Sequence, residues 1–164
     1  MLVLGIDPGC TSTGYGVVQQ HRGRYHLIAA GAFRTSAKTP MAERLATIHA
    51  GLREVIASHS PEVVSIEAIF RHKSSESALK LGQARGVALL AAAQDGLPVY
   101  EYNAMTVKKT VTGSGRADKN QMARVVQMLV GKSLDLPHDA TDAVAIAITH
   151  ISHAPSLRAM EQRA

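Results

Sequence analysis

The sequence predicts one α/β domain, in which a five-stranded mixed sheet is flanked by helices. Three apolar segments with strand character follow one another at the start of the chain, and segments with helix and strand periodicity then alternate. The length of 164 residues fits one compact domain with its own core. We place this domain at residues 1–152. Residues 153–164 have little apolar surface to bury and are expected to form a C-terminal tail that can be disordered.

The first three strands are expected to form an antiparallel meander. Leu2–Ile6 is a short apolar run that ends in the turn residues Asp7-Pro8-Gly9. Gly14–Gln19 and Tyr25–Phe33 follow, and the segment His21-Arg22-Gly23 between them is typical of a hairpin. The chain therefore opens as three consecutive antiparallel strands.

The rest of the chain alternates between helices and strands. Thr39 can cap a helix with Pro40 in its first turn, and apolar residues then recur at steps of three and four up to Ile56. The β-branched segment Val63–Ile69 is typical of a central strand, and Val99–Tyr102 of a short one. Further helices are predicted over Ser74–Gln94, Asp118–Val130 with a stop at Gly131, and Asp139–Ile151, whereas Ala104–Thr110 forms one turn or two before a break at Gly113-Ser114-Gly115.

The balance of charge indicates an acidic partner. The chain carries 18 Lys and Arg against 13 Asp and Glu, a formal net charge of +5, and its pI is about 9.6. Nucleic acid is the first candidate, and a basic domain without an anionic ligand is the alternative. Cys10 is the only cysteine, which excludes an intrachain disulfide and suits a reducing cytosol. Because no signal segment or membrane-spanning run is evident, we expect a cytoplasmic protein.

Four acidic residues stand at the ends of predicted elements. Asp7 follows the first strand, and Glu67 lies near the end of the fourth. Asp139 and Asp142 are spaced i, i+3 at the start of the last helix, which puts them on one helix face. Ligands collect outside the carboxyl ends of strands in open α/β sheets. If the first and fourth strands are neighbours, the four carboxylates therefore form one site.

A site made of carboxylates favours hard divalent cations. Mg²⁺ and Mn²⁺ prefer carboxylate and water oxygens. Two such ions about 3.5–4 Å apart can hold the attacking water and the leaving oxygen of phosphodiester hydrolysis. We therefore predict a metal-dependent nuclease with two ions per site, and we assign Asp7 as the bridging ligand because a strand end is rigid.

Each acid also has a purely structural interpretation. Asp7 can form an Asx-turn before Gly9, and Glu67 can lie on the polar face of an edge strand. Asp139 and Asp142 can serve only to cap their helix and complement its dipole. The functional interpretation gains its weight from the presence of all four acids in one basic chain.

Basic residues flank the predicted acid site. Phe70 is expected either to insert between DNA bases or to close the core at the strand end. His138 is a possible accessory residue, as a ligand or general acid, and the alternative is a bystander in a loop. Cationic loops near strand ends suit phosphates, although runs of charge also occur on merely solvated faces. The basic candidates for DNA binding are Arg71, Lys73, Lys108, Lys109, Arg116 and Lys119.

Taken together, the motifs resemble the RuvC family of Holliday-junction resolvases. The resemblance rests on Gly5–Gly9 with Thr13–Gly16, on Ile66–Phe70, on Ser77–Gly86 and on Asp139–Ala147, in this order along nearly the whole chain. It implies a ribonuclease H-like fold and a homodimer that nicks two strands of a four-way DNA junction symmetrically. It also implies a branch-migration motor of RuvA and RuvB as a partner. The family's acidic ligands fall on Asp7, Glu67, Asp139 and Asp142, its junction-contacting aromatic on Phe70, and two of its DNA-handling lysines on Lys108 and Lys119.

Two other functions fit parts of the sequence. Gly5–Thr11 resembles the first phosphate loop of actin-type and sugar-kinase ATPases, but these proteins need two such domains, for which 164 residues leave no room. A catalytically silent junction-binding module is disfavoured because all four acids are present. A dimer interface is expected on one predicted helix, with ordinary packing on the sheet as the alternative for most of its residues: Leu79, Leu81, Gly82, Gly86, Leu89 and Leu90.

Overall fold

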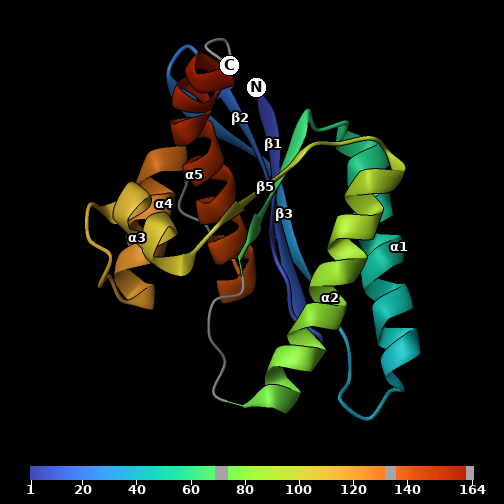
Figure 1. The fold of residues 1–164 in the computed structure, drawn as a ribbon. Coiled ribbons are helices and arrows are strands. Elements are labelled where there is room, and N and C mark those ends of the chain that lie inside the picture. The colour runs from blue at the N-terminus through green and yellow to red at the C-terminus, as the bar shows by residue number, and fades with distance from the viewer. Residues whose placement is uncertain (69–73, 132–135, 162–164) are drawn as a thin grey trace.

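The computed structural model describes residues 1–68, 74–131 and 136–161, and it consists of five strands and the helices on either side of them (Figure 1). The strands are β1 (Leu2–Asp7), β2 (Ser12–His21), β3 (Arg24–Arg34), β4 (Val63–Glu67) and β5 (Val99–Tyr102). The helices are α1 (Met41–His59), α2 (Ser75–Gln94), α3 (Ala104–Thr112), α4 (Lys119–Val130) and α5 (His138–Glu161). The predicted mixed sheet flanked by helices is confirmed.

The strands lie in the order β3-β2-β1-β4-β5. β1, β2 and β3 form the predicted antiparallel meander, whereas β4 pairs in parallel with both β1 and β5. The first and fourth strands are therefore neighbours, and Asp7 and Glu67 lie at the carboxyl ends of adjacent strands. Because β4 is an inner strand, the interpretation of Glu67 as an edge-strand residue is wrong.

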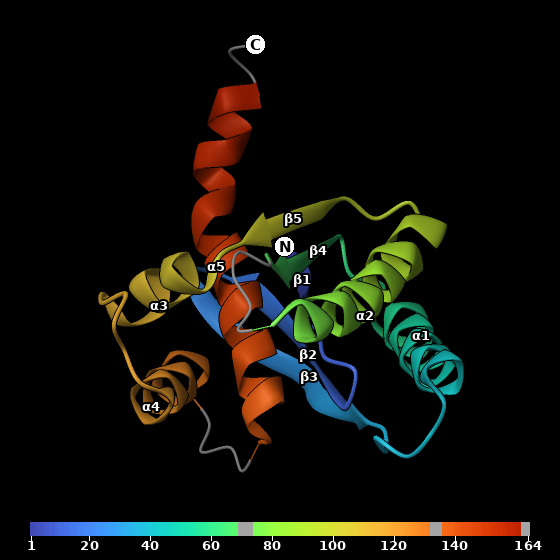
Figure 2. The same ribbon diagram turned by 60° about the horizontal axis from the view of Figure 1, so that its bottom comes forward.

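Apolar cores lie on both faces of the sheet. α1 and α2 cover one face, where Ile48 packs with Leu4 and Ile6 of β1. α5 covers the other face, where Ile146 joins Val3 in a second core, and Figure 2 shows α3 and α4 beside α5. Successive side chains of β1 point to opposite faces, so this strand contributes to both cores.

The first turns of α5 lie against strand backbone that carries no side chain. A Cβ on Gly5 of β1 would lie 2.0 Å from the carbonyl oxygen of Ala143. A Cβ on Gly14 of β2 would lie 2.0 Å from the carbonyl oxygen of Asp139. Only glycine permits this approach, which brings Asp139 and Asp142 down to the strand ends.

The face of α2 that is buried is not the face that carries the predicted interface residues. Its buried residues are the alanines Ala84, Ala88, Ala91 and Ala92. Leu79 and Leu90 are 71% and 52% exposed, and Leu81 and Leu89 are only half-buried. The alternative that most of the predicted interface residues pack on the sheet is therefore wrong.

One helix differs from the expected one at its start, and another at its end. α1 is preceded by Pro40 as its N-cap residue, without a side-chain cap, because Thr39 belongs to a turn in which its N–H donates to the carbonyl of Ser36. α3 has nine residues, about two and a half turns, and so ends two residues beyond the predicted segment. The side chain of Asn103 caps it by accepting from the N–H of Thr106. The element order is therefore βββαβαβααα.

The ends of other elements were partly predictable. Gly113 and Gly131 end α3 and α4, as predicted. α5 continues past the expected end at Ile151 to Glu161, because Ile151 and Ala154 are still buried against the body of the protein. The expected boundary at residue 152 therefore falls inside a helix. None of the helices in the described part of the chain combines the length and apolarity that a membrane crossing requires.

Candidate active site

The four predicted acids lie at one edge of the sheet, where β1, β4 and α5 meet. Asp7 and Glu67 end two adjacent parallel strands. Asp139 and Asp142 lie in the first two turns of α5, and the backbone of Asp139 lies over Gly14, which pairs with Asp7 across β1 and β2. The functional role of this group stays a prediction, but its members share one place in the fold.

Asp7 is the most perturbed of these acids. Its pKa is raised from an ordinary value of 3.8 to about 8, first by burial and then by the negative charges of Glu67, Asp142 and Asp139. The positive charge of Lys119 opposes this rise. A carboxyl group surrounded by other carboxylates is held in its neutral form unless a cation is added, so this position favours a bound metal ion.

The pKa of Asp142 is subject to opposing effects, and the net result is a rise. Burial raises its pKa, and the charge of Asp139 adds to the rise. The charges of Lys119, His138 and Lys108 lower the pKa of Asp142. His138 is exposed at the first residue of α5, so it can influence the acid site without being buried in it.

The donor atoms at this edge of the sheet are of the chemical type that binds a divalent cation. They are all carboxylates, the ligands that Mg²⁺ and Mn²⁺ prefer. Among the residues that the structure describes, no three Asp, Glu, His or Cys side chains are arranged to hold an ion. Burial and, after it, the negative charges of the other acids raise the pKa of Asp7, and a bound cation would oppose both effects. The residues that would hold the metal are Asp7, Glu67, Asp139 and Asp142.

The turn after β1 is held by Thr13 rather than by Asp7. The buried Thr13 hydroxyl accepts from the N–H of Gly9 at 3.2 Å and donates to the carbonyl of Gly9 at 2.7 Å. The buried Arg44 donates to the carbonyl of Cys10 at 3.1 Å, which fixes the next residue of the turn. The Asx-turn interpretation of Asp7 is therefore wrong, because the N–H that such a turn would use already has Thr13 as its acceptor.

Asp139 is held from a strand. The hydroxyl of Ser12, the first residue of β2, donates to Oδ2 of Asp139 at 2.5 Å. The sequence reasoning missed Ser12, because no local pattern marks a partner 127 residues away.

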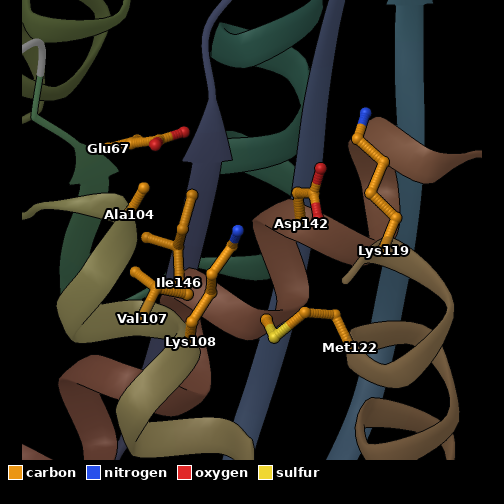
Figure 3. A pocket seen from close by; sticks show the side chains of 8 residues that line it. All are labelled: Glu67, Ala104, Val107, Lys108, Lys119, Met122, Asp142 and Ile146. Atoms are coloured by element: carbon orange, nitrogen blue, oxygen red, sulfur yellow. The ribbon is translucent and has the colours of Figure 1, made fainter. Parts of the chain in front are cut away.

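A pocket opens beside the acids, and two of the predicted basic residues line it. Figure 3 shows Lys108 of α3 pointing toward the space between Glu67 and Asp142, with Lys119 of α4 on the other side of Asp142. The apolar wall was not predicted, although Ile146 lies one helical turn after Asp142 and helix spacing could have found it. The lining residues are Glu67, Ala104, Val107, Lys108, Lys119, Met122, Asp142 and Ile146.

The other predicted DNA-binding residues are not part of this pocket wall. Lys109 and Arg116 are exposed on α3 and in the segment before α4. Phe70, Arg71 and Lys73 fall in the segment 69–73, outside the described residues. Base insertion by Phe70 and phosphate binding by these cations therefore stay predictions.

Known proteins match the chain along almost its full length. The family model described as "Crossover junction endodeoxyribonuclease RuvC" matches residues 3–150. A relative with this description from Moorella thermoacetica is 48% identical over 156 residues, which are 94% of this chain and 93% of the relative. Another from Citrifermentans bemidjiense is 45% identical over 160 residues, 98% of this chain and 97% of the relative.

Solved structures of Holliday-junction resolvases have the same fold as this chain. T. thermophilus RuvC in complex with Holliday junction substrate has a TM-score of 0.89 and 39% identity, covering 95% of this chain and 96% of that one. The yeast mitochondrial Holliday junction resolvase, with a TM-score of 0.64, 14% identity and coverage of 95% and 80%, shares the fold alone. The fold is ribonuclease H-like, and the ATPase alternative is set aside. The chain belongs to the RuvC family of crossover junction endodeoxyribonucleases.

Proposed function

We propose that this protein resolves four-way DNA junctions in recombination and repair by cutting two strands symmetrically with bound divalent ions. The observation that carries the proposal is the buried Asp7, whose pKa is raised to about 8 among three other acids at the sheet edge. Lys108 and Lys119 line one pocket together with two of these acids, Glu67 and Asp142. The T. thermophilus relative that was solved with a Holliday junction substrate supports the choice of DNA.

The side chains of the acid site and of the adjoining pocket would have separate roles in the reaction. When bound, two Mg²⁺ or Mn²⁺ ions would activate the attacking water and stabilise charge on the phosphate. Asp7 would hold both ions from a rigid strand end, and the other three acids would hold one ion or the other. Lys108 and Lys119 would grip the phosphates on either side of the cut. The exposed His138 would serve as an accessory residue, either as a metal ligand or as a general acid.

Symmetric cutting calls for a homodimer, and the outer face of α2 supports one. Leu79 and Leu90 are largely exposed. A Cβ on Gly82 or Gly86 between them would meet nothing within 4 Å, so a second helix can approach closely there. An exposed apolar face of this kind is typical of a protein interface. A twofold dimer would present two acid sites to a junction that has approximate twofold symmetry.

We propose that the enzyme is cytoplasmic, because its single cysteine suits a reducing compartment. We also propose that it works with the RuvA–RuvB branch-migration motor, and this second proposal rests only on the resemblance of the motifs to the family.

A cleavage assay tests the proposed activity. A synthetic four-way junction and a linear duplex of the same sequence are incubated with the protein in Mg²⁺, Mn²⁺ or EDTA. We expect paired nicks in the junction with either ion, none with EDTA, and cutting of the duplex at least about a hundred-fold slower, because specific nucleic-acid binding is usually at least about a thousand-fold tighter than non-specific binding. Equal cutting of both substrates would refute junction selectivity, and binding without any cutting would favour the silent module.

The dimer has its own test. Leu79→Glu puts a charge on the outer face of α2, where we expect dimerisation to weaken by about 2 kcal/mol or more, roughly thirty-fold. Sedimentation measures the change in dissociation constant, and junction cleavage should shift from paired to single nicks. Met128→Glu is the control, because Met128 is 79% exposed on α4, away from α2. Wild-type protein that sediments only as a monomer at micromolar concentration would contradict the dimer.

A further inference from the structure

Asp139 is fixed at two points by β2. Its backbone lies over Gly14, where a Cβ would come within 2.0 Å of the Asp139 carbonyl oxygen. Its side chain accepts the hydrogen bond from Ser12 to Oδ2 at 2.5 Å. Ser12 itself pairs with Arg34 in the β2–β3 ladder, which fixes the strand backbone that carries the hydroxyl. The carboxylate therefore has a defined orientation relative to the strand ends.

The bond to Ser12 distinguishes the two oxygens of Asp139. Oδ2 is engaged by the hydroxyl, which leaves Oδ1 as the oxygen better able to ligate a metal ion. Ligation through one carboxylate oxygen suits Mg²⁺ and Mn²⁺, which take six ligands. Ca²⁺ takes six to eight oxygens, about 2.3–2.6 Å away, and often binds a carboxylate through both oxygens. A carboxylate with one oxygen tied to a serine is a poorer ligand for Ca²⁺.

We propose that Ser12 is a positioning residue that holds Asp139 as a one-oxygen ligand and thereby favours Mg²⁺ and Mn²⁺ over Ca²⁺. Ser12 acts through Asp139 and touches no reacting group. The inference rests on the proposed metal site and goes beyond it by naming a residue outside the four acids that sets ion selectivity. Hydrogen bonds to ligating carboxylates commonly change metal affinity by about ten- to a hundred-fold.

The test measures ion binding without DNA or catalysis. Isothermal titration of the full chain with Mn²⁺, and competition with Ca²⁺, gives both dissociation constants for wild type, Ser12→Ala and Ser12→Thr. We expect Ser12→Ala to weaken Mn²⁺ binding about ten-fold and to leave Ca²⁺ binding unchanged or tighter. Ser12→Thr keeps the hydroxyl and should restore the wild-type preference.

Ser152→Ala is the matched control for the loss of a serine hydroxyl. Ser152 also lies in a side-chain hydrogen bond, at 2.9 Å from the hydroxyl of Tyr25, but it is far along α5 from the acids. This variant should bind both ions like the wild type, even if it melts at a lower temperature. A change of Mn²⁺ affinity in Ser152→Ala as large as that in Ser12→Ala would show that the effect of Ser12 is merely structural.

Further outcomes separate the inference from the proposed function. An unchanged Mn²⁺ dissociation constant in Ser12→Ala, or an equal loss for both ions, overturns the role of Ser12. A folded Ser12→Thr variant that fails to recover the preference overturns it as well. If Asp7→Asn binds Mn²⁺ as tightly as the wild type, the metal site itself is wrong and the inference falls with it. Loss of binding in Asp7→Asn together with a silent Ser12→Ala leaves the proposed function standing alone.

Discussion

Asp7→Asn is expected to abolish cleavage and, in the same protein, to stabilise the metal-free fold. The amide removes the charge that would bridge two ions at the cut phosphate. Metal ions supply several kcal/mol of transition-state stabilisation, so the rate of junction cleavage should fall by about a thousand-fold or more. Binding of the junction, measured by gel shift in Ca²⁺ or EDTA, should remain, because the phosphate-binding lysines are unchanged.

The gain in stability follows from the raised pKa of Asp7. Folding raises this pKa from 3.8 to about 8, so between these pH values the folded protein holds a proton that the unfolded chain has released. The stability of the metal-free protein must therefore fall as the pH rises through this window. Because Asn does not ionise, the variant does not lose this stability as the pH rises. At pH 8 the variant should melt several degrees above the wild type, since 1 kcal/mol corresponds to about 2–4 °C in a chain of this size.

Calorimetry across pH measures this difference. The melting temperatures of the two proteins in EDTA should converge as the pH falls below 3.8, where Asp7 becomes protonated in the unfolded chain as well as in the folded one. Added Mn²⁺ should raise the melting temperature of the wild type and leave Asp7→Asn unchanged. Glu54→Gln removes an exposed acid of α1 and serves as the control, with no change expected in cleavage or melting. A variant that still cuts would contradict the metal-bridging role of Asp7, and one that melts below the wild type at pH 8 in EDTA would contradict its raised pKa.

The positions of Asp7 and Glu67 could be predicted because strand ends are marked locally. The turn residues after Ile6 end β1, and the β-branched run through Ile66 marks β4 as an inner strand. Parallel pairing of these two strands then puts both acids at the same edge, as the structure has them. The i, i+3 spacing of Asp139 and Asp142 predicted that these two acids share one face of the last helix. Periodicity and turn chemistry are local properties, so a single sequence carries them.

Contacts between distant segments carried no such signal. The bond from Ser12 to Asp139 joins residues 127 positions apart, and neither residue's neighbours indicate it. The outer face of α2 carries leucines and glycines and its inner face alanines, and because both faces are apolar the sequence could not show which one faces the core. α3 is two residues longer than predicted, because its second half packs on the protein: Val107 and Val111 are buried against the core around α5. Tertiary burial decided these features, and local propensity did not.

Gly14→Ala is expected to displace Asp139 from the acid site while the rest of the fold stays intact. Its Cβ would lie 2.0 Å from the carbonyl oxygen and 2.3 Å from the carbonyl carbon of Asp139, and backbone atoms cannot rotate away as a side chain does. The first turn of α5 must therefore shift, and Asp139 must move away from Asp7 and Ser12. Misplacement of catalytic groups by about 1 Å costs roughly a hundred-fold in rate, and overpacking of this kind costs about 1–3 kcal/mol of stability.

Gly31→Ala gives the matched strand control. Its Cβ would meet the far end of the Tyr15 side chain at 2.9 Å, and this ring can move. Junction cleavage, Mn²⁺ binding and thermal melting are compared in both variants. Gly14→Ala should lose cleavage and Mn²⁺ affinity by more than its modest drop in melting temperature explains, whereas Gly31→Ala should change mainly the melting temperature. Wild-type Mn²⁺ affinity in Gly14→Ala would mean that the approach of α5 to bare strand backbone does not set the geometry of the acids.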